Sequence, residues 1–224
     1  MSPKNIMEAA VKADISIIAV TDHNSMANCS VYHKTAQRYN IKYLYGIEIQ
    51  TAEEIHLVAL FNHPKEALKF DEELYHSLLP LDNKPDYFGD QVVIDEDENI
   101  TRFEKKALIN SSRWTLEETV SKLRSYDTFI FPAHIDAPTF SIIGQLGFID
   151  NNLDFDALGI TADCNLKEFL EQHSYLKNKA FIRNSDAHYL NQIGKGFTSF
   201  YIQSPDIKEI GFACQKKGDR KYVV

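Results

Sequence analysis

The stretch ISIIAVTDHNS, residues 15–25, contains the pattern that decides the fold class. A mostly apolar run, Ile15 to Val20, is followed at once by a polar group that includes Asp22 and His23. Short runs of this kind, bounded by polar or turn residues, are typical of buried β-strands. We therefore predict a strand that ends beside ionisable side chains. Similar runs occur at residues 41–47, 56–61, 129–132, 158–161, 180–182 and 197–202.

Segments with helical periodicity separate most of these runs. We predict helices over residues 1–13, 25–39, 115–126 and 166–177, with Ser2 and Pro3 opening the first. Thr115 and Glu118 form a candidate capping box for the third. Such alternation is typical of α/β proteins with a mainly parallel sheet or barrel. The runs at 41–47 and 56–61 are too close for a helix between them, so a hairpin or bent strand pair is expected there.

Residues 62–112 interrupt this alternation. A helix-like stretch leads into PLDNKPDYFGD and then into QVVIDEDENITRF, which predicts a β-hairpin turning at Glu96 to Asn99. Because the alternation resumes after residue 112, we expect a single domain over residues 1–224 that contains an α/β-hairpin insertion.

The composition is that of an ordinary soluble globular protein. The chain has 224 residues, 44% of them hydrophobic and 25% charged, and a formal net charge of −8. Three cysteines cannot form a disulfide framework, no signal peptide is evident, and no run reaches the ~18 apolar residues of a membrane span. We expect a cytoplasmic protein without a membrane partner. The acidic balance argues against long nucleic acid, because phosphate neutralisation supplies most of that affinity.

Histidines and carboxylates lie beside the predicted strand ends. The carboxyl ends of parallel strands converge on one face, so side chains placed there should meet. Mixed imidazole and carboxylate ligation suits Zn²⁺, Mn²⁺ or Fe without choosing among them. For any single residue, a helix cap or a hydrogen-bonded turn is the alternative interpretation. The candidates are Asp22, His23, Glu48, His56, His134, Asp186 and His188.

Five short motifs occur in order along the chain. They are TDHNS at 21–25, GIEI at 46–49, EIHLVAL at 54–60, PAHID at 132–136 and NSDAH at 184–188. In this order they resemble the successive motifs of the PHP (polymerase and histidinol phosphatase) family of metal-dependent phosphoesterases. The resemblance implies a distorted TIM-like (β/α)7 barrel with a cluster of up to three divalent metal ions at its carboxyl-terminal mouth.

The resemblance also implies roles for individual residues. His23 would bind one metal and Glu48 would bridge two, while His56 and His134 would serve the same cluster from their strand ends. Asp186 and His188 would hold a further ion. Two more carboxylates are candidates at the catalytic site: Asp22, which would orient a ligand, and Asp136, for which a surface turn is the alternative.

One part of the family pattern is absent. The family opens with a strand carrying an HxH motif, and nothing comparable precedes Ile15. We therefore expect a barrel without its first strand and an incomplete set of ligands that holds fewer ions. A truncated or misassigned start explains this, and a degenerate member of the family is the alternative.

The function that these residues predict is hydrolysis of a phosphate ester by a metal-activated hydroxide. The expected partner is a small phosphorylated substrate, a phosphomonoester or small nucleotide. A non-catalytic regulatory module and an exonuclease-type phosphodiesterase are the alternatives. Candidate substrate contacts, each also explained by capping or by a solvated surface charge, are Asn24, Ser25, Arg183 and Lys195.

Overall fold

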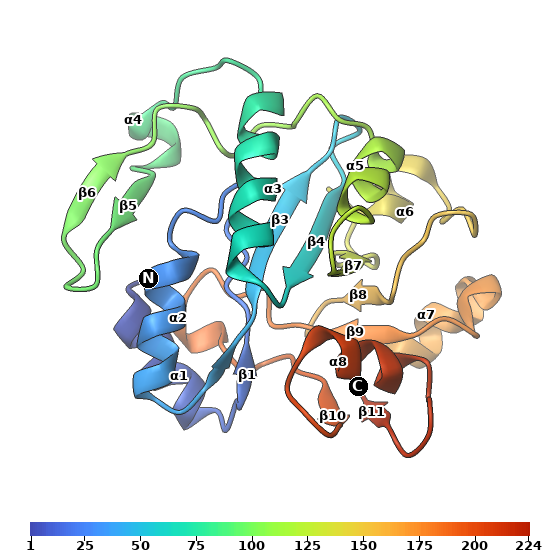
Figure 1. Cartoon of the computed structure of the whole chain (residues 1–224). Coiled ribbons are helices and arrows are strands. Elements are labelled where there is room, and N and C mark those ends of the chain that lie inside the picture. Colours follow the sequence, from blue (N-terminus) through green and yellow to red (C-terminus); the bar gives the residue numbers. More distant parts are fainter.

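A computed structural model describes all residues, 1–224, as a mixed α/β fold (Figure 1). All seven predicted strand segments contain a strand, although several strands are only two or three residues long. The strands are β1 (Ile17–Ile18), β2 (Lys42–Tyr43), β3 (Tyr45–Gln50), β4 (His56–Phe61), β5 (Val92–Ile94), β6 (Ile100–Phe103), β7 (Thr128–Pro132), β8 (Leu158–Ile160), β9 (Phe181–Arg183), β10 (Ser199–Tyr201) and β11 (Lys221–Val223).

Side-chain caps open several of the helices. The Ser2 side chain caps the first helix with Pro3 in its first turn, and Thr115 with Glu118 forms the predicted capping box. None of the helices has the length and apolarity needed to cross a lipid bilayer. The helices are α1 (Pro3–Lys12), α2 (Cys29–Arg38), α3 (Pro64–Ser77), α4 (Pro85–Phe88), α5 (Leu116–Leu123), α6 (Ile142–Leu146), α7 (Leu166–Gln172) and α8 (Ile207–Cys214), with 3-10 turns η1 (Ser174–Leu176) and η2 (Leu190–Gln192).

The central sheet has the order β3-β4-β7, and β4 runs antiparallel to both neighbours. The prediction of a hairpin between residues 41–47 and 56–61 is confirmed for β3 and β4, since only residues 51–55 connect them. The prediction of a mainly parallel sheet is wrong for this central part. Parallel pairing is confined to β1 with β2 and β8 with β9.

The strands do not close into a barrel. They form separate small sheets, and a cavity of about 1320 Å³ lies between the segments of β1 and β9. Apolar side chains line its interior, among them Leu44, Val58 and Phe131. Its wall also includes His23 and Glu48, so the cavity and the predicted metal residues adjoin each other. The structure thus has the mixed α/β layers that were predicted, while the predicted barrel, expected without its first strand, is not seen as a closed barrel.

Alternate residues of β4 face two different hydrophobic clusters, as the pleat of a strand requires. Leu57, Ala59 and Phe61 belong to the larger cluster, which the surrounding helices cover. Val58 and Leu60 belong to the smaller cluster, which α8 closes from below. Both faces of β4 are buried, and all of its residues are apolar except the first, His56.

The segment 62–112 has two structurally different parts. Helix α3 lies across β3 and β4, and its residues Ala67, Phe70 and Leu74 are fully buried in the larger cluster (Figure 1). Strands β5 and β6 form the predicted hairpin, whose turn is held by hydrogen bonds to the Asp95 carboxylate. The first half of the predicted insertion is therefore a layer of the core, while the hairpin projects from one side.

Candidate metal centre

His23 and Glu48 are brought together by parallel backbone pairing. The segment after β1 runs beside β3, where Glu48 N–H donates to Asp22 C=O and Asn24 N–H donates to Glu48 C=O, at 3.2 and 2.8 Å. This pairing places His23 Nδ1 at 3.3 Å from Glu48 Oε2. The segment that follows β1 therefore places His23 beside the carboxylate of Glu48 on β3.

His56 and His134 approach the same carboxylate from the other side. Because β4 is antiparallel to β3 and β7, its first residue lies where those two strands end. His56 Nδ1 is 3.7 Å from Glu48 Oε2 and 3.2 Å from His134 Nε2. His134 Nε2 is in turn 3.9 Å from Glu48 Oε1. Four side chains thus converge: Glu48 from within β3, His56 from the start of β4, and His23 and His134 from the segments that follow β1 and β7.

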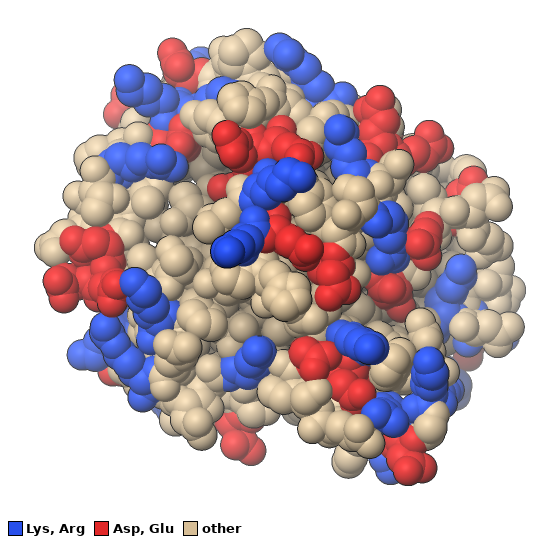
Figure 2. All heavy atoms as spheres, in the orientation of Figure 1, with Lys and Arg blue, Asp and Glu red and all other residues tan.

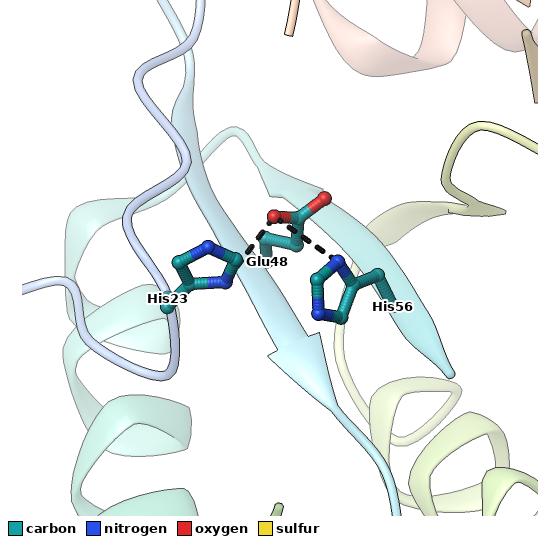
Figure 3. A group of neighbouring side chains, drawn as sticks. All are labelled: His23, Glu48 and His56. Atoms are coloured by element: carbon teal, nitrogen blue, oxygen red, sulfur yellow. Dashed lines mark ion pairs between the residues drawn. The ribbon is translucent and has the colours of Figure 1, made fainter. Parts of the chain in front are cut away.

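Figure 3 shows the Glu48 carboxylate between the imidazole rings of His23 and His56. One donor atom from each of these three residues lies within 4.8 Å of the others, an arrangement that could hold a metal ion. The shortest approach of His134 is its 3.2 Å contact with His56, so it extends the same group. We call these four residues, His23, Glu48, His56 and His134, the metal cluster.

The electrostatics of the metal cluster fit a bound cation. Glu48 is 7% exposed, and its only ion-pair partners are imidazoles. Burial, and then the charge of Asp186, raises the pKa of Glu48 to about 8. Burial and the neighbouring imidazoles lower the pKa of His56 to about 3, so its ring is neutral and able to bind a metal. The buried Nδ1 of His23, 3.3 Å from Glu48 Oε2, has no hydrogen-bond partner, so this atom is available to a metal ion.

The raised pKa of Glu48 predicts that the metal-free protein loses stability as the pH rises from about 4.5 to 8. The folded state holds a proton on Glu48 up to about pH 8, whereas the unfolded chain releases it near its ordinary value of 4.5. The contribution is therefore complete below pH 4.5 and is lost as the pH rises through 8, by up to about 1.4 kcal/mol per pH unit. Urea unfolding of metal-free protein between pH 6 and 9 should show a decline that Glu48→Gln lacks; equal slopes for the two proteins would contradict it.

Asp186 and His188 lie at the edge of the metal cluster and are more exposed. The ring of His188 is 6.4 Å from that of His23, and His188 Nδ1 is 3.8 Å from Asp186 Oδ1. Asp22 lines the cavity. Desolvation by the surrounding protein raises the pKa of its carboxyl group to about 6. These three predicted residues are therefore adjacent to the metal cluster without joining its close contacts.

Asn24 has a structural role in this arrangement. Its side chain is fully buried, donates to Leu108 C=O and Asn110 C=O at 2.8 and 2.9 Å, and accepts from Gln50 N–H at 3.0 Å. The amide therefore offers no accessible atom to a substrate. Ser25 Oγ accepts from Ala27 N–H, and α2 begins only at Cys29, so the predicted helix start at residue 25 is wrong. Tertiary hydrogen bonds hold residues 24–28 outside the helix.

Arg183 and Asp136 are engaged with the loop after β8. The Arg183 guanidinium donates to the carbonyls of Thr161, Ala162 and Cys164 at 2.7–3.0 Å. The Asp136 carboxylate accepts both the backbone N–H and the hydroxyl of Thr161. The two side chains thus order this loop, whereas Lys195 is exposed in the segment that follows η2.

Two residues that were not predicted contact the metal cluster. Gln50 Oε1 is 3.4 Å from His56 Nε2, and the Phe140 ring stacks on the His56 ring at 4.9 Å. The spacing of Glu48 and Gln50 contained a signal, because residues two apart on a strand point to the same side. No such spacing connects Phe140 to His56, because Phe140 reaches it from the loop between β7 and α6.

The sequence of the chain matches a known protein family. The family model of the PHP domain matches residues 1–176. YqxK, an uncharacterised protein of Bacillus subtilis, is 30% identical over 109 residues, which are 46% of this chain and 27% of YqxK.

Solved structures show the same fold. Lesion-specific endonuclease Q from Pyrococcus furiosus is similar with a TM-score of 0.69 and 18% identity, over 99% of this chain and 52% of that chain. A protein from Bifidobacterium adolescentis described as a metal-dependent phosphoesterase is similar with a TM-score of 0.54 and 14% identity, over 84% and 82% of the two chains. This chain thus spans about half the length of the endonuclease.

The prediction that excluded long nucleic acid as a partner is wrong. A structure of endonuclease Q with a 27-mer duplex, which holds an abasic lesion at the active site, matches 97% of this chain and 52% of that chain, with a TM-score of 0.67 and 17% identity. The same fold therefore accepts DNA. Net charge was a poor criterion because it sums over the whole chain, whereas phosphates meet local groups and bound cations. Figure 2 shows acidic and basic side chains interspersed over one face of the molecule.

The family follows from the extent of the match and from the residues that it contains. The matched residues include the whole metal cluster, which the fold brings together around Glu48. The motif order, the open α/β layers and the similarity to solved PHP-type structures agree with this assignment. The chain belongs to the PHP domain family of metal-dependent phosphoesterases.

Proposed function

We propose that this chain hydrolyses a phosphate ester bond with divalent metal held by the metal cluster. The observation that carries the proposal is the buried Glu48 carboxylate, which three imidazoles surround and no Lys or Arg neutralises. A buried carboxylate without a cationic partner is costly, and a bound metal removes that cost. Zn²⁺, Mn²⁺ and Fe all accept this donor set.

The residues of the chain divide into holding and neighbouring groups. His23, His56 and His134 would present neutral nitrogen atoms, and Glu48 would supply the negative charge between them. When bound, divalent metal supplies Lewis acidity and lowers the pKa of a coordinated water. Asp186 and His188, which lie close to His23, would add donors at the exposed edge where the substrate enters.

A phosphodiester bond in DNA is the substrate class that the comparisons favour. The similarity to endonuclease Q extends over almost the whole chain, and that protein acts on a duplex with an abasic lesion. The cavity beside the metal cluster, at about 1320 Å³, exceeds the size typical of small-ligand sites, ~300–1,000 Å³. It has room for a nucleotide turned out of a duplex. Phosphomonoesters and small nucleotides remain the second candidate, because the same metal cluster would serve them.

Metal-loaded protein should cleave at least one of these substrates. The chain would be stripped of metal, loaded separately with Mn²⁺, Zn²⁺ or Fe²⁺, and incubated with an abasic-site duplex, the intact duplex and a panel of phosphomonoesters. We expect turnover that a chelator abolishes and that metal restores, because the metal cluster is the only catalytic group proposed. Gel analysis of labelled DNA and release of inorganic phosphate separate the two substrate classes.

His76→Ala provides the control for histidine loss, because His76 lies on α3 outside the metal cluster. It should keep the activity of the parent chain, whereas His134→Ala should lose it. Metal uptake without turnover on any substrate would indicate a non-catalytic member of the family. No metal uptake by the folded chain would defeat the proposal itself.

A further inference from the structure

The His56 side chain is held on two sides by residues outside the metal cluster. Gln50 and His56 are directly paired across β3 and β4, and Gln50 Oε1 lies 3.4 Å from His56 Nε2. The Phe140 ring stacks on the His56 ring with an angle of 9° between the planes. The Phe140 carbonyl also accepts the His56 backbone N–H at 2.8 Å. His56 is therefore the most constrained imidazole of the metal cluster.

The Gln50 amide lies between Ser111 and His56 and contacts both. In the structure its Nε2 donates to Ser111 Oγ at 3.1 Å, and its oxygen faces His56. The side chain is 5% exposed, and the backbone on either side is tied to Asn24 and Ser112. An amide oxygen can only accept a hydrogen bond, so the hydrogen of the neutral His56 ring must lie on Nε2.

The opposite nitrogen of His56, Nδ1, then carries the lone pair that can bind metal. Nδ1 lies 3.7 Å from Glu48 Oε2 and 3.2 Å from His134 Nε2. If the hydrogen were on Nδ1 instead, the lone pair of Nε2 would face the oxygen of Gln50, and the two acceptors would repel each other. Partners behind a metal ligand commonly set its tautomer and ring orientation in this way.

Phe140 adds a second constraint, on the plane of the ring. It adopts φ +54, a conformation that bulky residues rarely take, and its side chain remains 38% exposed. The bond from His56 N–H to its carbonyl and the Ser141 cap of α6 hold the loop in this conformation. Stacking of the Phe140 ring then restricts rotation of the imidazole.

We propose that Gln50 is a positioning residue of the metal centre, which holds His56 as the Nε2–H tautomer and directs Nδ1 toward the metal, with Phe140 fixing the plane of the ring. This inference rests on the proposed function, since it assumes that the metal cluster binds metal. It also links the segment 62–112 to the metal cluster, because Ser111 anchors the Gln50 amide. Gln50 touches neither substrate nor metal in this role.

The test combines the tautomer in metal-free protein with Zn²⁺ affinity. Nitrogen-15 spectra of the histidine rings should show His56 as the Nε2–H tautomer in the parent chain. Gln50→Leu keeps the volume and removes the acceptor, so the tautomer preference should disappear and Zn²⁺ affinity should fall about 10–100-fold. Gln50→Glu keeps an acceptor and should retain the tautomer, with affinity within about threefold of the parent. A merely structural role for Gln50 would not produce this difference in tautomer and Zn²⁺ affinity between the Gln50→Leu and Gln50→Glu variants.

Gln37→Leu is the matched control, because Gln37 makes a comparable hydrogen bond to His33 at 3.1 Å on the exposed face of α2. It should change neither the His56 spectrum nor the Zn²⁺ affinity. If Gln50→Leu does not fold, Ser111→Ala releases the amide and should weaken the tautomer preference in a folded chain. A parent chain with hydrogen on His56 Nδ1, or an unchanged tautomer in these variants, would overturn the proposal. Because the spectra need no metal, failure of Zn²⁺ binding would count against the proposed function alone.

Discussion

Replacing Glu48 with Gln should reduce the affinity for divalent metal by more than about 100-fold, since loss of partners behind a ligand already costs 10–100-fold. Glu48 is the only carboxylate within the metal cluster, and all three imidazoles approach its oxygen atoms. The amide is nearly isosteric and cannot supply the negative charge. Calorimetric titration with Zn²⁺ and Mn²⁺ measures the loss, and any phosphoesterase turnover should disappear with it.

Glu209→Gln is a close control for this experiment. Glu209 is also 7% exposed, but its carboxylate is bound by the Arg220 guanidinium at 2.9 and 3.0 Å, between α8 and the approach to β11. Hydrogen bonds from Arg220 lower the pKa of Glu209, whereas burial raises the pKa of Glu48. Glu209→Gln should therefore leave metal affinity unchanged. Equal affinity of the parent and Glu48→Gln proteins would mean that metal, if bound, lies elsewhere.

Phe70→Ala should lower the free energy of unfolding by about 3–5 kcal/mol, the range for removing a buried aromatic side chain. Phe70 on α3 is fully buried, and its ring lies 5.7–6.0 Å from those of Phe61, Trp114 and Tyr126. These neighbours lie on β4 and in the segments just before and just after α5. Because several different elements surround Phe70, they cannot readily move together to fill the cavity that the substitution leaves. Urea unfolding of metal-free protein at pH 6 measures the change.

Tyr87→Ala supplies the comparison within the same segment. Tyr87 lies on α4 and is 84% exposed, so its loss should change the free energy of unfolding by less than about 0.5 kcal/mol. A large difference between the two variants would show that α3 belongs to the core although it falls inside the predicted insertion. Similar small effects would mean that α3 can be removed from the fold without cost.

Much of the fold could be predicted because its signals are local. An apolar run such as the one at 56–61 indicates a strand whatever it packs against. Thr115 and Glu118, three residues apart, cap a helix through contacts with each other. The direction of β4 also followed from local information, since five residues cannot carry a crossover. Closure of the sheet is a long-range property, so the tertiary structure decided where the strands stay apart, between β1 and β9.

The metal cluster could be predicted from residue types at strand ends, because the polar residues there stand out against apolar runs. His23, Glu48, His56 and His134 converge as expected, although His56 reaches the group from the start of an antiparallel strand. The supporting residues could not be predicted in the same way. Asn24 and Arg183 are attractive substrate contacts in the sequence, yet backbone carbonyls use their donors in the structure.

The sequence by itself determined the family and the α/β class, and it predicted six metal ligands, of which the structure brings His23, Glu48, His56 and His134 close together. These follow from motif order and periodicity, which depend on neighbours along the chain. Only the tertiary structure decided which polar groups remain free to act, because a side chain is available only after its hydrogen bonds to distant residues are known. Gln50 and Phe140 show the reverse case, since packing turned an amide and an exposed aromatic ring into partners of His56.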